Sequence, residues 1–325
     1  MMRVEERIKS DIAAGRIEGA AVYVSQRGKT LLRGYYGNVT EERLFRIASM
    51  TKPITAVAVL KLWETGLLQL TDPVVKYLPG FDPRLQIRHL LTHTSGLSQE
   101  WYADHITDDH RRDGVLLTDF IAAVPYDHDP GTYAQYNPVA AFHLLTAIVE
   151  QVAKVDFATY VEREILIPCD MKNTTFLPTK DQWARLVPMA DTKAGCVFEG
   201  YPVTTPLGGA GLVSNLEDYQ NFAKMLLQKG VFQDKRILKA ETVTAMATPQ
   251  ESVQEGSVRW GYGVRVVVGE NRLPKGSYGW SGAYGTHFWI DPENEIIAIY
   301  MKNSRTDGGA GAKTAANLEE DVYTK

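Results

Sequence analysis

A serine and a lysine three residues apart, Ser49 and Lys52, are the residues of this sequence best suited to covalent chemistry. They follow the strand-like run 44–47, and Pro53 after them is tolerated only in the first turn of a helix, so a helix is expected to begin near Ser49. Residues three apart share one helix face, which places the hydroxyl beside the amine. A serine hydroxyl becomes an effective nucleophile when a base lies within hydrogen-bonding distance.

The start of this predicted helix also favours the chemistry electrostatically. The positive end of the helix dipole lies close to Lys52 and favours the neutral amine, which is the form that accepts a proton. Backbone N–H groups exposed there, including that of Ser49, can stabilise an oxyanion. The alternative is a helix-capping serine and a solvated lysine, since this spacing occurs about once by chance in a chain of this length. Further motifs must decide between the two.

Four segments spread over the chain resemble the class C β-lactamase-like serine hydrolases, which include D,D-peptidases, D-aminopeptidases and carboxylesterases. In this family Ser49 and Lys52 form the S-x-x-K motif. The resemblance implies an α/β (α+β) protein of the β-lactamase/D,D-peptidase or penicillin-binding protein fold. Such a protein has an antiparallel β-sheet flanked by helices and a mostly helical inserted domain. The four segments are 45–55 (FRIASMTKPIT), 89–97 (HLLTHTSGL), 208–214 (GGAGLVS) and 279–292.

The family also uses a tyrosine from its helical domain, in a Tyr-x-Asn motif a few residues after Pro-Gly-Thr. Here Pro-Gly-Thr occupies 130–132 and is followed by YAQYNP at 133–138, so the spacing matches Tyr136. Tyr133 is the competing assignment. The resemblance implies that the phenol passes a proton between the serine and the leaving group, with the lysine cation stabilising its charge.

The asparagine of the same motif is displaced in this chain. Pro138 stands where the family has asparagine. Asn137 could make the usual amide contact to an acyl side chain after a shift of one residue.

The third family motif, Lys-Thr-Gly or His-Thr-Gly on a strand facing the serine, is replaced here by WSG at 280–282. The missing cation is the group that recognises the carboxylate of a β-lactam or of a peptide ending in D-alanine. Trp-x-Gly is similar to the esterase branch, where an aromatic wall suits an uncharged acyl or alcohol group. The residues implied to bind substrate are Tyr133, Asn137, Trp280, Ser281 and Gly282, and the N–H groups of Ser49 and Ala283 form the oxyanion hole, with Gly282 permitting close approach.

Two other patterns suggest different chemistry and are set aside. His89 and His93 have the spacing of a zinc-binding helix, but Leu90 replaces the glutamate of H-E-x-x-H, so a structural role is favoured. Ser281 lies in a near match to the G-x-S-x-G elbow of α/β-hydrolases. That elbow requires a helix directly after the serine, whereas residues 285–290 are strand-like, so Ser281 is rejected as the nucleophile.

Hydrophobic periodicity predicts the elements that position these residues. Val4, Ile8 and Ile12 at four-residue spacing predict an N-terminal helix that stops at Gly15. The other expected helices cover 51–65, 141–152, 216–228 and 239–247, and the expected strands cover 20–26, 30–36, 262–268, 277–281, 287–291 and 296–301, with a hairpin turn at 291–294.

The expected strands lie near the two ends of the chain, and the middle is predicted to be helical. A sheet built from early and late strands must close around that middle part. We therefore expect a discontinuous α/β domain of residues 1–80 and 205–325 and a mostly helical domain of residues 81–204. The active site is expected in the cleft between them.

Composition excludes several classes of function. The 325 residues carry a formal net charge of −4, which disfavours nucleic acid as a partner. No apolar stretch approaches the ~18–20 residues of a membrane span. The charged N-terminus lacks the apolar segment of a secretion signal, so a cytoplasmic protein is expected. Cys169 and Cys196 form no zinc or disulfide pattern and are expected to be buried small residues.

The sequence therefore predicts a serine hydrolase that acts through an acyl-enzyme, with a carboxylesterase favoured and a small-molecule ester or amide as substrate. No metal or organic cofactor is implied, and the oligomeric state is left open. β-Lactamase, D,D-peptidase or D-aminopeptidase activity is the alternative within the family. A catalytically silent ligand-binding protein of the same fold is the alternative from another class.

Overall fold

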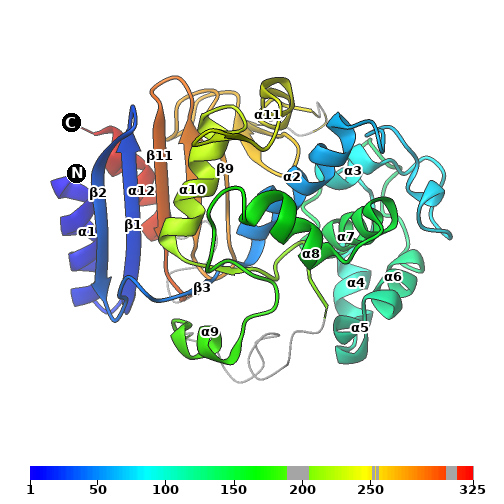
Figure 1. The fold of residues 1–325 in the computed structure, drawn as a ribbon, viewed down its shortest axis with the longest axis horizontal. Coiled ribbons are helices and arrows are strands. Elements are labelled where there is room, and N and C mark those ends of the chain that lie inside the picture. Colours follow the sequence, from blue (N-terminus) through cyan, green and yellow to red (C-terminus); the bar gives the residue numbers. More distant parts are fainter. Residues whose placement is uncertain (189–204, 251–252, 254–255, 305–312, 325) are drawn as a thin grey trace.

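Strands from both ends of the chain form one seven-stranded antiparallel sheet in the computed structural model, which describes residues 1–188, 205–250, 253, 256–304 and 313–324 (Figure 1). The central strands β1, β11 and β10 are almost wholly buried, as expected of apolar runs covered on both faces. The strand order is β2 (Lys29–Gly37), β1 (Gly19–Gln26), β11 (Ile296–Met301), β10 (His287–Asp291), β9 (Tyr278–Ser281), β8 (Arg265–Val267) and β7 (Val258–Trp260).

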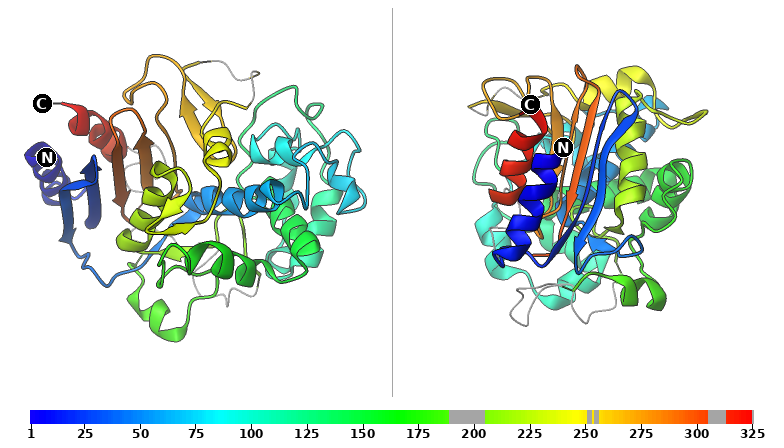
Figure 2. Two further views of the ribbon diagram at one scale, coloured as in Figure 1. Left: turned by 45° about the horizontal axis from the view of Figure 1, so that its top comes forward. Right: turned by 90° about the vertical axis from the view of Figure 1, so that its left-hand side faces the viewer.

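The two terminal helices, α1 (Met2–Ala13) and α12 (Lys313–Tyr323), lie side by side on one face of the sheet (Figure 2). The predicted apolar positions Val4 and Ile8 are buried in a cluster that includes Leu318 of α12. An ion pair of 2.8 Å joins Arg7 of α1 to Asp321 of α12. The antiparallel sheet flanked by helices is confirmed.

Helix α10 (Leu216–Leu227) covers the other face of the sheet, and α2 (Thr51–Glu64) belongs to the same hydrophobic cluster. The sequence predicts one apolar face for α2, at Ile54, Val57 and Leu62. In the structure every residue from Thr51 to Leu60 is buried, because α2 also packs against α7 (Ala140–Ala153). Helix α2 is thus a central helix, and its first turn can hold a buried side chain.

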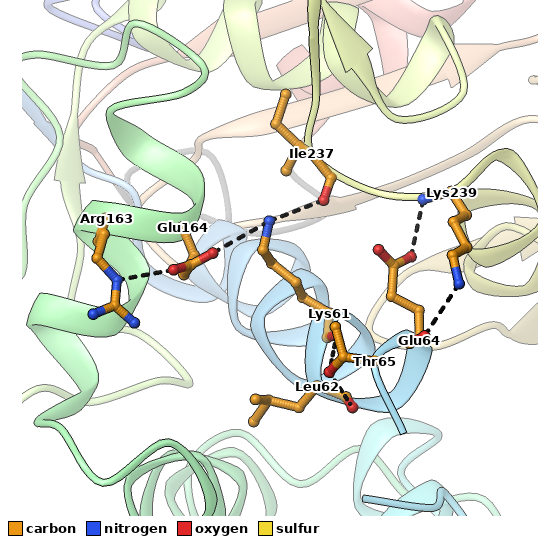
Figure 3. A network of polar contacts seen from close by, with 8 residues as sticks. All are labelled: Lys61, Leu62, Glu64, Thr65, Arg163, Glu164, Ile237 and Lys239. Atoms are coloured by element: carbon orange, nitrogen blue, oxygen red, sulfur yellow. Dashed lines mark hydrogen bonds and ion pairs between the residues drawn. The ribbon is translucent and has the colours of Figure 1, made fainter. Parts of the chain in front are cut away.

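Polar contacts fix the far end of α2 to two neighbouring segments (Figure 3). Lys61 Nζ lies 3.1 Å from the carbonyl oxygen of Ile237 and 3.3 Å from the Glu164 carboxylate. Glu64 accepts a hydrogen bond from the Lys239 backbone N–H at 2.9 Å. These contacts hold the helix that begins at the candidate nucleophile against both flanking parts of the chain.

The middle of the chain is mostly helical over its described residues, as predicted. One hydrophobic cluster runs from the sheet through α2 into α7, so the division at residues 80 and 205 stays a prediction. The helices of this part are α3 (Ile87–Leu91), α4 (Gln99–His105), α5 (Asp108–Arg112), α6 (Gly114–Ala122), α7, α8 (Phe157–Val161) and α9 (Lys180–Arg185). The described residues also form helix α11 (Ala240–Met246) and the short strands β3 (Phe45–Arg46), β4 (Val213–Ser214), β5 (Val231–Phe232) and β6 (Lys235–Arg236).

Two strand predictions need correction. Residues 262–268 are not one strand, because Gly263 has a φ of 73° and closes the turn between β7 and β8, and β7 itself was not predicted. The strand predicted at 44–47 is reduced to β3, which pairs only with β4.

The prediction that the cysteines are buried is confirmed for Cys169. Cys169 is fully buried, and burial raises the pKa of its thiol to about 12. Cys196 lies outside the described residues. In the part of the chain that the structure describes, no helix is both long and apolar enough to cross a membrane.

Candidate active site

The candidate nucleophile sits in a tight turn between β3 and α2. Ser49 is the middle residue of a single 3-10 turn, Ala48–Met50, and its exposed fraction is 9%. Ala48 has a φ of 45°, in the left-handed region that residues with a Cβ seldom adopt. Such backbone strain persists only where surrounding contacts hold it, and the Tyr219 hydroxyl does so by donating to the Met50 carbonyl at 2.8 Å.

Three side chains meet at this turn, and they are the three that the sequence predicts to be catalytic. The Oγ of Ser49 and the hydroxyl of Tyr136 share a hydrogen bond of 2.6 Å. Lys52 Nζ lies 3.1 Å from the same Oγ. The serine hydroxyl therefore has two groups within proton-transfer distance.

Lys52 is completely buried, and two backbone carbonyls surround its amine. Its Nζ donates to the carbonyl oxygens of Pro138 and Gly209, each at 2.7 Å. Burial lowers the pKa of Lys52 from its usual value. A neutral amine has two hydrogens, which these two acceptors occupy, so its lone pair faces Ser49 Oγ. That is the arrangement of a general base.

Side chains of α2 hold the glycine-rich segment 208–212 in position. Thr55 donates to the Gly208 carbonyl at 2.7 Å, and Thr51 accepts from the Leu212 backbone N–H at 3.2 Å. A Cβ at position 209 would lie 2.8 Å from the Pro138 carbonyl oxygen, so only glycine allows both carbonyls to reach Lys52. The sequence matched this segment to the family but did not show that its Gly209 carbonyl binds Lys52.

His93 holds the tyrosine in place. Its carbonyl accepts from the Gln135 N–H at 2.9 Å, and its Nδ1 accepts from the Asn137 N–H at 3.2 Å. The residue between these two is Tyr136, whose ring centroid lies 4.7 Å from that of His93. Burial lowers the pKa of His93 well below its usual value, so the imidazole is neutral.

His89 and His93 do not form the histidine pair of a zinc-binding helix, a pattern that the sequence analysis set aside. Helix α3 ends at Leu91, and His93 has a φ of 55°, so His89 and His93 do not share a helix face. The structural role favoured by the sequence is correct, but the sequence did not show that His93 supports Tyr136.

Aromatic side chains form a wall beside the tyrosine. The ring centroid of Trp280 lies 5.1 Å from that of Tyr136 and 4.7 Å from that of Trp260. The Trp260 ring in turn lies 4.3 Å from that of His93. The sequence predicted the tryptophan of β9 but not Trp260, because a tryptophan in an unpredicted strand carries no local signal for this site.

The turn after β9 approaches the nucleophile turn closely. Thr286 donates to the carbonyl oxygen of Ile47 at 3.0 Å. A Cβ on Gly282 would collide with the Ile47 carbonyl and with the Thr286 hydroxyl, so glycine is required for this approach. Ala283 follows Gly282 directly in this turn and is exposed.

Comparison with known proteins shows the family of this chain. The β-lactamase family model matches residues 4–322 of the chain. The chain belongs to the β-lactamase family. Esterase EstB of Burkholderia gladioli is 28% identical over 366 residues, which cover 95% of this chain and 92% of EstB.

Solved structures with the same fold include a hydrolase and a penicillin-binding protein homologue. EstCE1, a hydrolase with promiscuous acyltransferase activity, superposes with a TM-score of 0.84 at 22% identity over 99% of this chain and 98% of its own. A penicillin-binding protein homologue from Caulobacter crescentus gives a TM-score of 0.84 at 18% identity over 99% of this chain and 96% of its own. The predicted β-lactamase/D,D-peptidase fold is confirmed.

Not every residue proposed for substrate binding in this β-lactamase-family chain faces the site. The Tyr133 side chain is 50% exposed and lies against His128, with ring centroids 4.6 Å apart, and Tyr136 is the tyrosine bonded to Ser49. The competing assignment to Tyr133 is therefore wrong by geometry.

Asn137 is the second correction. Its side chain is 2% exposed, and its Oδ1 accepts from the Ala141 N–H at 3.2 Å in the first turn of α7. The predicted amide contact to an acyl group does not fit, because the side chain supports this helix from inside the protein.

Ser281 is the third correction. Side chains alternate between the faces of a strand, so Ser281 and its neighbour Trp280 point to opposite faces of β9. Trp280 faces Tyr136, and Ser281 instead bonds His287 on the side of α12. Ser281 therefore does not line the Ser49 site.

Proposed function

We propose that this chain is a serine hydrolase that cleaves esters through an acyl-enzyme on Ser49. The observation that carries the proposal is the hydrogen-bonded group of Ser49, Lys52 and Tyr136, in which a buried amine and a phenol both contact one serine oxygen. A nucleophile with a base held within hydrogen-bonding distance is the arrangement that covalent catalysis requires.

In the proposed reaction the Ser49 proton passes to Lys52 as Oγ attacks the ester carbonyl carbon. The N–H groups of Ser49 and Ala283 stabilise the oxyanion. The alkoxide leaves with a proton delivered through Tyr136. Water then attacks the acyl carbonyl carbon, and the water proton passes through the same groups to Ser49 Oγ as the acid is released. The enzyme thus returns to its starting protonation state.

The aromatic wall supports an ester over a β-lactam or a peptide ending in D-alanine. Trp280 occupies the place of the cation that binds a carboxylate in other branches of the family, and it packs on Tyr136 beside the nucleophile. An aromatic surface favours an uncharged acyl or alcohol group. The relative EstB is an esterase, which supports the same choice. We place the site between the two predicted domains, since Tyr136 comes from the helical middle of the chain.

The test is a substrate panel with purified protein. We expect p-nitrophenyl acetate and butyrate to be hydrolysed much faster than nitrocefin or a D-Ala-D-Ala peptide. The opposite order would support β-lactamase or D,D-peptidase activity instead. Absence of turnover and of any fluorophosphonate adduct on Ser49 would support a silent ligand-binding protein.

A further inference from the structure

A second serine with a histidine and a carboxylate lies on the opposite face of β9. Ser281 Oγ is 2.7 Å from His287 Nδ1, and His287 Nε2 is 3.0 Å from Glu319 Oε1. Ser281 and His287 are cross-strand partners on β9 and β10, and Glu319 comes from α12. Three separate elements thus form one hydrogen-bonded chain of serine, histidine and glutamate.

The ionised glutamate fixes the tautomer of this histidine. Arg272 lies 3.0 Å from the second carboxylate oxygen of Glu319. Burial would raise the pKa of Glu319, but its bonds to His287 and Arg272 hold that pKa below the usual value. A carboxylate only accepts hydrogen bonds, so a neutral His287 carries its proton on Nε2. Its Nδ1 is then free to accept the proton of Ser281.

A cavity of about 110 Å³ gives access to this hydroxyl. It lies between the sheet and α12, and its lining includes Ser281, His287, Leu273, Trp289 and Ala315. The apolar members of this lining can bury a short acyl chain beside Ser281, whose side chain is half-buried.

We propose that Ser281 is a second nucleophile, which accepts a short acyl group from an activated ester or a phosphonyl group from a small fluorophosphonate. In the first case Oγ attacks the carbonyl carbon and its proton moves to His287 Nδ1. The C–O bond to the alcohol then breaks, and the alcohol leaves with that proton. The product is an acyl ester on Ser281. In the second case Oγ attacks the phosphorus atom, the P–F bond breaks and fluoride leaves, while the serine proton moves to His287 Nδ1.

This serine reacts more slowly than Ser49. In a G-x-S-x-G elbow the N–H after the nucleophile stabilises the oxyanion. Here that N–H belongs to Gly282 and donates to the Thr286 carbonyl at 2.7 Å. Ser281 also ends a strand, so it has no helix N-terminus behind it. We therefore expect a stable adduct and little turnover at this site.

The experiment follows adducts by intact-protein and peptide mass spectrometry after incubation with a small ethyl fluorophosphonate and with p-nitrophenyl acetate. We expect Ser49→Ala to carry one adduct on the peptide with Ser281. The double variant Ser49→Ala/Ser281→Ala should lose that adduct. Ser277→Ala in the Ser49→Ala background is the matched control, because Ser277 lines the same cavity and should not affect labelling.

A substitution of His287 tests whether it acts as the base for Ser281. His287→Gln in the Ser49→Ala background should slow labelling of Ser281 by about 100-fold, as expected for the loss of a general base. Circular dichroism and the melting temperature show whether each variant is folded. A folded Ser49→Ala protein without an adduct on Ser281 would overturn the proposal, as would a labelling rate that His287→Gln leaves unchanged. Neither result bears on Ser49, which is tested separately in the wild-type protein.

Discussion

The hydroxyl of Tyr136 lies 2.6 Å from Ser49 Oγ, although the two residues are 87 positions apart in the sequence. His93 binds the backbone on both sides of the tyrosine, and Lys52 binds the carbonyl of Pro138 two residues after it. The tyrosine is therefore held by the same buried groups that surround the serine and the lysine. The position of Tyr136 therefore depends on the packing of the whole site, and substitutions in the site can test this.

Tyr136→Phe removes the hydroxyl and keeps the ring that packs on Trp280. We expect kcat/KM for p-nitrophenyl butyrate to fall by about 10²–10⁴-fold, the usual contribution of one proton-transfer group. Tyr133→Phe is the matched control, because the Tyr133 side chain is half-exposed and packs on His128, and this variant should keep wild-type activity. Equal losses in the two variants would contradict the assignment of Tyr136.

Lys52→Met removes the buried amine. We expect a fall in kcat/KM of about 10²–10⁴-fold or more, because Ser49 loses its base. Lys61→Met is the control in the same helix, since Lys61 bonds Ile237 and Glu164 far from the serine (Figure 3). Steady-state kinetics measure kcat/KM for both variants. Activity that survives Lys52→Met in a folded protein would show that another group takes the proton.

The pH profile of kcat/KM should show one ascending limb that belongs to Lys52. The neutral amine is the active form, so the rate rises with pH until Lys52 is deprotonated and then levels off. Burial lowers the pKa of Lys52, so the midpoint of this limb lies below pH 10.5, the usual pKa of lysine. His89 and His93 do not account for this limb, because burial lowers the pKa of the first to about 4 and that of the second well below 6.5.

The lowered pKa of Lys52 also makes the stability of the fold depend on pH. Between the lowered pKa of Lys52 and pH 10.5 the unfolded chain binds a proton that the folded chain does not. The contribution of this group to the free energy of unfolding therefore rises with pH across that window. Denaturant unfolding of the wild type and of Lys52→Met measures it, and a contribution that falls with pH would contradict a neutral buried lysine.

His93→Ala should lower kcat for ester hydrolysis by about 10²-fold, since a displacement of 1 Å in a reacting group has a cost of this size. The variant removes both the Nδ1 acceptor for Asn137 N–H and the ring beside Tyr136. His93→Asn should recover part of the activity, because asparagine offers an acceptor and tolerates the φ of 55° at this position. If both variants keep full kcat, the positioning role is wrong.

Features that depend on local sequence were predicted well. Strands β10 and β11 have the predicted bounds, because short apolar runs between turn residues allow little choice. Ser49 and Lys52 lie three residues apart, so the start of one helix is enough to bring them together. Tyr136 was found through its spacing from Pro-Gly-Thr in a family motif.

Features that depend on packing between distant segments were missed. The carbonyls of Pro138 and Gly209 reach Lys52 only after α2 is enclosed on both sides. Trp260 joins the aromatic wall from β7, a strand that no local pattern indicated. The expected strand 277–281 already placed Trp280 and Ser281 on opposite faces, but which of the two faces Tyr136 depends on how the sheet packs.

The most direct test of the central claim is peptide mass spectrometry of the protein quenched during turnover of p-nitrophenyl butyrate. We expect one butyryl group on Ser49 in the wild type, and its loss together with ester turnover in Ser49→Ala. Turnover that continues at the wild-type rate in Ser49→Ala, or a butyryl group that never occupies Ser49 in the active wild type, would contradict the account.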